Sequence, residues 1–251
     1  METMITSTKN DYVKHIRALH SSKGRSEYKE ILVEGEKCVR ELLAFMPERL
    51  RSVIVTEGRF DDIAQAASSN GVRVLTAAEH VMNALCECQT PQGIAAVAAI
   101  PDYDPVRDGF IVALDDVQDP ANVGAIIRTA DAAGASGIAL SPACADAFSP
   151  KAIRASMGSV FHLPIFKTPL PDYLASLISG SYHVACSHLR GSTDFALDWK
   201  NTCLVIGNES KGISEAVMAF ATDIIRIPMY GKAESLNAAV AAGILIYKIR
   251  T

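Results

Sequence analysis

Polar and charged residues gather in three loops, each directly after an apolar run in the second half of the chain. The loops are residues 115–128, 207–214 and 227–237, which read DDVQDPANVGAIIR, GNESKGIS and IPMYGKAESLN. Ligands of open parallel sheets bind beyond the carboxyl ends of the strands, so loops of this kind can form one composite site. Their amide, carboxylate, hydroxyl and guanidinium groups could orient a ligand and assist a proton transfer.

The first loop leads into a predicted helix from about Val123 to Ala133. Either Asp119 or Asn122 can cap that helix, with Pro120 stiffening the approach. Arg128 then lies about one and a half turns into the helix, close enough to the loop to reach a phosphate or a ribose. Taken alone, the segment is better explained by a capped helix whose arginine faces solvent.

The second loop begins at Gly207, which allows a strand to end in an unusual backbone turn. Asn208, Glu209 and Ser210 would then offer polar groups to a ligand. The alternative is an ordinary helix start capped by Ser210 or Ser214. In the third loop, Ser235 or Asn237 would cap the last helix. The small residues of that helix, 238–243, favour close packing in the core or a subunit interface.

The remaining composition narrows the possible functions. The sequence has neither G-x-G-x-x-G nor G-x-x-x-x-G-K-[ST], so it lacks the usual support for a dinucleotide-binding or P-loop enzyme. Its six cysteines form no C-x-x-C pair, which favours reduced thiols over a zinc or redox centre. The cluster Cys86-Glu87-Cys88 could hold a metal in principle, but no second ligand pair lies nearby in the sequence, so we expect no metal. No apolar run of membrane-spanning length and no apolar leader segment occur, so we expect a cytoplasmic protein without membrane contact.

The charge pattern is mixed for a nucleic-acid-binding protein. The whole chain carries a formal net charge of −4, which does not favour binding to a polyanion. The first 25 residues are the exception, because five basic residues outnumber Glu2 and Asp11; the basic residues are Lys9, Lys14, Arg17, Lys23 and Arg25. The segment can form a basic N-terminal arm that contacts phosphates. On charge alone, a solvated and frayed terminus is the better explanation.

The apolar pattern predicts two domains. Residues 1–100 alternate short strands and helices as a small α/β domain, and residues 101–108, rich in proline and aspartate, form a linker. Residues 109–251 contain apolar strands that alternate with helices, which is typical of a mostly parallel, Rossmann-like sheet covered on both faces.

Taken together and in order, NVGAIIR, GNESKGIS and IPMYGKAESLNAAVAAGI closely resemble the three signature motifs of the SpoU (TrmH-like) family of RNA 2′-O-ribose methyltransferases, in the SPOUT superfamily. The stretch RASMGSVFHLP (154–164) is also similar to the family. The first 100 residues look like the ribosomal-protein-like (L30e/L7Ae-like) RNA-binding domain that often precedes the catalytic domain.

This resemblance implies an α/β fold with a C-terminal trefoil knot, a homodimer, and S-adenosylmethionine as cofactor. It implies a catalytic neighbourhood made of Asn122, Arg128, Glu209, Ser235 and Asn237. It also implies a cofactor site formed by Ile206, Gly207, Asn208, Ile227, Met229 and Leu236. No metal is required, because the sulfonium group already makes the methyl group electrophilic. We favour ribosomal RNA over transfer RNA as the substrate.

Two other classes of function remain open at this point. A non-catalytic RNA-binding or ribosome-assembly factor could keep this fold without turnover, although the retained polar residues of the motifs argue against it. An unrelated α/β enzyme with a nicotinamide cofactor is suggested only by the alternation of strands and helices, and the missing glycine fingerprint weakens that reading.

Overall fold

The computed structural model describes residues 4–251, and the chain divides into two compact units. The first unit comprises the chain through Pro101 together with Phe148–Phe161, and the second comprises Asp102–Ala147 and His162–Thr251. The expected domain boundaries are linear, whereas Phe148–Phe161 belongs with the N-terminal unit although it comes late in the sequence. Glu2, which was counted in the charge of the N-terminal segment, lies outside the described residues.

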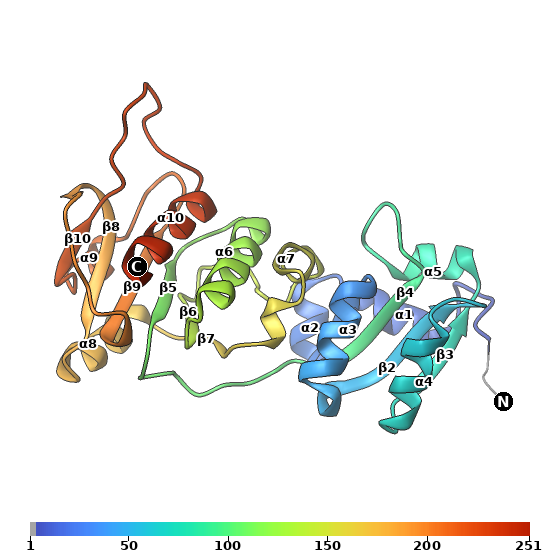
Figure 1. The fold of residues 1–251 in the computed structure, drawn as a ribbon. Coiled ribbons are helices and arrows are strands. Elements are labelled where there is room, and N and C mark those ends of the chain that lie inside the picture. The colour runs from blue at the N-terminus through green and yellow to red at the C-terminus, as the bar shows by residue number, and fades with distance from the viewer. Residues whose placement is uncertain (1–3) are drawn as a thin grey trace. The chain divides into compact units, whose positions relative to one another are not determined.

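The N-terminal unit is built on a four-stranded sheet with strand order β1-β4-β2-β3 (Figure 1). The strands are β1 (Glu30–Glu34), β2 (Leu50–Thr56), β3 (Arg73–Ala77) and β4 (Ile94–Ala99). β4 runs antiparallel to both neighbours, and β2 pairs with β3 in parallel. The connecting helices are α3 (Glu36–Phe45), η1 (Pro47–Arg49), α4 (Asp61–Ser69) and α5 (Glu79–Leu85), and α7 (Pro150–Ser156) with η2 (Ser159–Phe161) joins the same unit.

The basic N-terminal segment is folded and is not a free arm. It forms α1 (Asp11–Ala18) and α2 (Ser22–Tyr28), and α1 buries Val13 and Ile16 in the core. Arg25 is 4% exposed and donates hydrogen bonds to the carbonyl groups of Leu19 and His20, while Lys14 pairs with Asp11. Arg25 is therefore a structural residue, and the expectation of an arm is corrected because amphipathic helices bury one of their faces.

The second unit contains a six-stranded sheet with strand order β10-β8-β9-β5-β6-β7, and every strand pair in it is parallel. The strands are β5 (Ile111–Asp115), β6 (Gly137–Leu140), β7 (Ile165–Lys167), β8 (His183–Ser192), β9 (Thr202–Gly207) and β10 (Asp223–Ile225). β5, β6 and most of β9 are buried, as expected for central strands that are covered on both faces. The predicted parallel α/β sheet, preceded by a small α/β unit, is confirmed.

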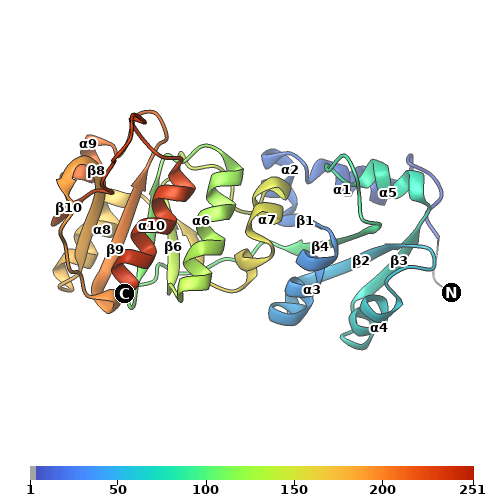
Figure 2. The same ribbon diagram turned by 45° about the horizontal axis from the view of Figure 1, so that its top comes forward.

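The helices of this unit are α6 (Pro120–Ala133), α8 (Leu170–Ser179), η3 (Trp199–Asn201), α9 (Glu215–Met218) and α10 (Ala238–Arg250). α6 and α10 pack against each other, and both views show them side by side (Figures 1 and 2). A Cβ atom added at Gly243 of α10 would lie at ordinary contact distance, 3.6 Å, from the methyl group of Thr129 of α6. No helix within residues 4–251 is long and apolar enough to cross a membrane.

Candidate active site

The first two polar loops meet because their strands are neighbours in the sheet. β5 pairs with β9 in parallel, and the last pair in the register joins Asp115 to Gly207. The loops that follow these two residues therefore leave the sheet at the same edge. This is the position at which ligands of parallel α/β sheets bind.

Asn122 connects all three loops. Its side-chain nitrogen donates to Oε1 of Glu209 at 2.7 Å, and its side-chain oxygen accepts from Nδ2 of Asn237 at 2.9 Å. Asn122 is 9% exposed, so both polar ends of its amide need partners inside the protein, and both have one. Residues separated by more than 80 positions in the sequence are thus joined through one side chain.

The orientation of these amides is determined by a helix cap. Asn237 caps α10, and its Oδ1 accepts from the backbone N–H groups of Ala239 and Val240. Its Nδ2 must then face Asn122 as a donor, which leaves the Asn122 oxygen as acceptor and its nitrogen as donor to Glu209. The cap thereby directs an N–H group at the Glu209 carboxylate. Between the two predicted caps of this helix, Ser235 and Asn237, the structure selects Asn237.

A tight turn presents Glu209. Asn208 and Gly212 exchange both backbone hydrogen bonds, at 3.0 and 2.9 Å, and the side-chain oxygen of Asn208 accepts from the N–H groups of Ser210 and Lys211. A Cβ atom at Gly207 would lie 2.4 Å from backbone atoms of Gly212 and Ile213, so only glycine fits there. The chain folds back so closely after Gly207 that the turn predicted there requires glycine at this position.

Two aspartates at the end of β5, which the sequence reasoning did not single out, hold this turn in place. Asp115 is 6% exposed, and its carboxylate accepts from the N–H group of Ser214 at 2.8 Å. Asp116 adopts the left-handed conformation with φ 58°, and its carbonyl oxygen accepts from Nδ2 of Asn208 at 2.8 Å. A non-glycine residue in this conformation is uncommon and concentrates at functional sites. An acidic pair directly after a buried strand was the available signal.

Arg128 lies outside this hydrogen-bonded cluster. It is six residues beyond Asn122 in α6, which places it about 120° around the helix axis from that residue. It is exposed, and its side chain makes no hydrogen bond or ion pair with the described part of the chain. Asp119, and not Asn122, caps α6, through a bond from the N–H group of Ala121 at 3.0 Å.

The third loop is open to solvent between β10 and α10. Met229 is 37% exposed, Leu236 is 36% exposed, and Ser235 is also exposed, whereas Ile227 is half-buried. No backbone or side-chain hydrogen bond from residues 227–236 to other described residues is found. The peptide N–H and C=O groups of this loop are therefore available to a ligand. An adenine ring, with donors and acceptors on its edge, fits such a segment.

Comparisons with known proteins agree with this geometry. Residues 109–247 match the model of the SpoU rRNA Methylase family, and residues 10–96 match the MRM3-like substrate binding domain. The chain is 35% identical, over 98% of both chains, to the 23S rRNA (guanosine(2553)-2′-O)-methyltransferase RlmP of Bacillus subtilis.

Solved structures give the same result. An AdoMet-bound rRNA methyltransferase from Sinorhizobium meliloti matches with a TM-score of 0.87 and 34% identity, covering 99% of this chain and 97% of that one. The SpoU methyltransferase AviRb from Streptomyces viridochromogenes, in complex with AdoMet, matches with a TM-score of 0.83 and 29% identity, over 96% and 98% of the two chains. The chain belongs to the SpoU family of RNA methyltransferases.

Proposed function

We propose that this protein transfers a methyl group from S-adenosylmethionine to a ribose 2′-hydroxyl group of ribosomal RNA. The observation that carries the proposal is the hydrogen-bonded chain from Asn237 through Asn122 to Glu209, which joins three loops at the ligand-binding edge of the sheet. Its matching family model and its curated relative support the same chemistry and favour ribosomal RNA as the substrate.

The cofactor site we propose lies between the end of β9 and the third loop. Its residues are Ile206, Gly207, Asn208, Ile227, Met229 and Leu236. When bound, the cofactor supplies a methyl group on a sulfonium sulfur, which leaves as a neutral thioether. The unpaired backbone groups of residues 227–236 would hold the adenine, and the exposed side chains of Met229 and Leu236 would cover it.

We assign Arg128 to positioning of the RNA. A guanidinium group stays protonated at any ordinary pH, so it can hold a phosphate or orient a hydroxyl group but does not serve as a base. Its exposed position without an internal partner is suited to this role. Glu209 and Ser235 would orient the nucleotide, while Asn122 and Asn237 hold the loops that carry them.

The proposal includes a homodimer, a knotted C-terminal segment and action in the cytoplasm. α10 exposes Val240, Ile244 and Tyr247 at 52%, 42% and 48%, on one face at helical spacing, and we infer that a second copy covers them. From β10 at the sheet edge the chain returns past β8 and β9 to α10 beside α6, a path that is compatible with a trefoil knot. The free cysteines among residues 4–251 suit a reducing compartment.

The test uses methyl-labelled S-adenosylmethionine with separated ribosomal and transfer RNA. The protein is expected to label a 2′-oxygen at one position of ribosomal RNA, and Arg128→Ala is expected to lose most of this activity. Arg107→Ala is the matched control, since Arg107 is an exposed arginine that precedes β5, at the opposite edge of the sheet. Label in transfer RNA alone would show that transfer RNA, and not ribosomal RNA, is the substrate. Cofactor binding without labelling of any RNA would favour a non-catalytic RNA-binding factor.

A further inference from the structure

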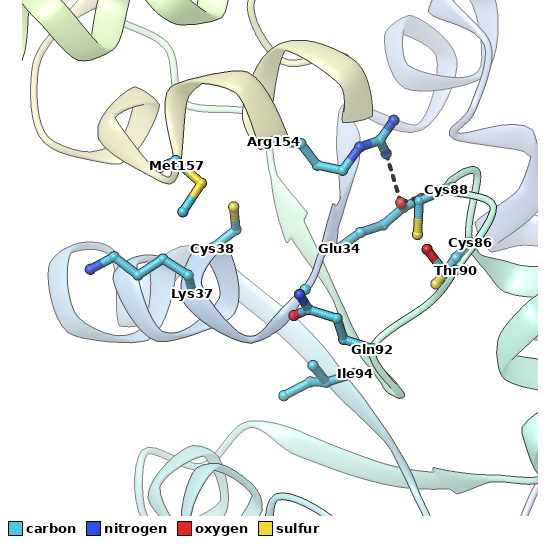
Figure 3. A pocket seen from close by; sticks show the side chains of 11 residues that line it. Glu34, Lys37, Cys38, Cys86, Cys88, Thr90, Gln92, Ile94, Arg154 and Met157 are labelled. Carbon is cyan, nitrogen blue, oxygen red and sulfur yellow. Dashed lines mark hydrogen bonds and ion pairs between the residues drawn. The ribbon is translucent and has the colours of Figure 1, made fainter.

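A cavity of about 210 Å³ in the N-terminal unit is lined by three of the six cysteines. Cys38, Cys86 and Cys88 face it together with Glu34 and Arg154, and all of these residues belong to the same unit. Within residues 4–251, Glu34, Cys86 and Cys88 form a group whose ligand atoms all lie within 4.8 Å of one another. Figure 3 shows the Glu34 carboxylate beside Cys88, with Cys38 further away.

Glu34 is held firmly in this position. It ends β1, is 2% exposed, and accepts hydrogen bonds from the N–H groups of Glu87 and Cys88 at 2.6 and 3.2 Å. Arg154 donates to its Oε2 at 2.7 Å. A carboxylate offers about four acceptor positions, so these three donors leave one position, on Oε1, within reach of the Cys88 thiol.

The two thiols are brought to this carboxylate by the loop that it binds. Cys86 directly follows α5, and Cys88 comes two residues later, on the backbone whose N–H groups contact Glu34. Both sulfur atoms and the carboxylate of Glu34 thus lie within 4.8 Å of one another in a largely buried place. The negative charge of Glu34 favours a cation at this position.

We propose that Glu34, Cys86 and Cys88 bind one thiophilic divalent cation of the zinc class, with a fourth position left to water. Tetrahedral coordination with Zn–S bonds of about 2.3 Å places two sulfur atoms roughly 3.8 Å apart, which the observed separations allow. On binding, the two S–H bonds break, both protons pass to solvent, and two metal–sulfur bonds form without change of oxidation state. One dication replaces two protons, so the net charge of the cluster with Arg154 is unchanged.

The cation would fasten the loop after α5 to the end of β1. The three ligands come together only in the folded protein, so the cation binds the folded state and not the unfolded chain. Binding therefore raises the free energy of unfolding, and the effect grows with the concentration of the cation and with its affinity. This role is separate from methyl transfer, so its test does not depend on the proposed activity.

The test uses the full-length protein, treated with a chelator and kept reduced with a phosphine. Titration with Cd²⁺ is expected to give thiolate-to-metal absorption that saturates at one cation per chain, and Zn²⁺ is expected to raise the melting temperature. Cys86→Ser with Cys88→Ser should abolish the absorption. Cys38→Ser is the matched control, because Cys38 lines the same cavity but lies outside the group.

A second measurement needs no variant. Zn²⁺ should slow alkylation of Cys88, the one of the three thiols that is partly exposed, by several-fold in the wild-type protein. Absence of thiolate absorption in the wild-type protein, equal absorption in the double variant, or unchanged alkylation of Cys88 would overturn the proposal.

Discussion

The side-chain nitrogen of Asn122 lies 2.7 Å from Oε1 of Glu209, and this bond joins the start of α6 to the turn after β9. The bond has a defined direction, because Asn237 already donates to the other end of the Asn122 amide. The helix cap at Asn237 therefore determines which end of the Asn122 amide donates to Glu209.

Asn122→Asp tests this bond directly. The substitution keeps the shape of the side chain but replaces the donor with a carboxylate beside Glu209, so we expect a large loss of methyl transfer. We also expect a loss of about 1–3 kcal/mol in the free energy of unfolding, since a buried polar group loses its partner. Enzyme assays and chemical denaturation measure the two effects.

Asn201→Asp is its matched control. Asn201 also donates to a carboxylate, that of Asp198 at 3.0 Å, but it is exposed in η3. Exposed charges interact weakly in water, so this variant should keep nearly all activity and stability. Equal effects of the two substitutions would contradict the role given to Asn122.

Substitutions of Asn237 separate the helix cap from the donor. Asn237→Asp retains an oxygen that caps α10 but removes the Nδ2 donor to Asn122, so activity should fall, and the unpaired oxygen of buried Asn122 should cost about 1–3 kcal/mol of stability. Asn237→Ala also removes the cap, and should cost about 0.5–2 kcal/mol more. Kinetic assays measure the loss of the donor, and thermal denaturation of both variants measures the loss of the cap. Equal activity of Asn237→Asp and wild type would refute the positioning role of Asn237.

Gly207→Ala is predicted to disrupt the turn that carries Glu209. The added methyl group would lie 2.4 Å from backbone atoms, which cannot rotate away. Overpacking of this kind costs about 1–3 kcal/mol, and we expect loss of cofactor binding as the turn shifts. Gly243→Ala is the control, since its added Cβ would lie 3.6 Å from the methyl group of Thr129, an ordinary contact distance, and Gly243 lies outside the proposed cofactor site. Calorimetric titration with S-adenosylmethionine should separate the two variants.

Stability is predicted to fall at alkaline pH. Burial, and then the charge of Asp115, raises the pKa of Cys186 to about 12, against an ordinary value of 9.0. Between pH 9 and about pH 12, the folded protein keeps the thiol proton that the unfolded chain loses. The contribution of Cys186 to the free energy of unfolding is therefore fully present below pH 9 and declines as the pH rises to about 12. Cys186→Ala should reduce this decline by up to about 1.4 kcal/mol per pH unit. Urea denaturation between pH 8 and 11 would show an unchanged slope if Cys186 does not contribute.

The sequence was sufficient to predict the parallel sheet, most of its helices and the three polar loops. Central parallel strands must be apolar on both faces, and loop residues such as Asp119 and Asn237 cap helices by local bonds, so both leave strong sequence signals. The family also followed from three ordered motifs. Charge alone did not reveal that the basic N-terminal segment forms two helices, or that Arg25 faces inward in α2.

The contacts within the site were decided only by the tertiary structure. Asp115 and Asp116 look like ordinary loop residues until β5 and β9 pair, and Cys86 and Cys88 look like buried thiols until β1 brings Glu34 to them. Local sequence determines periodicity and caps because these depend on neighbours three or four residues away. The meeting of Asn122, Glu209 and Asn237 depends on strand order, which brings together residues more than 80 positions apart.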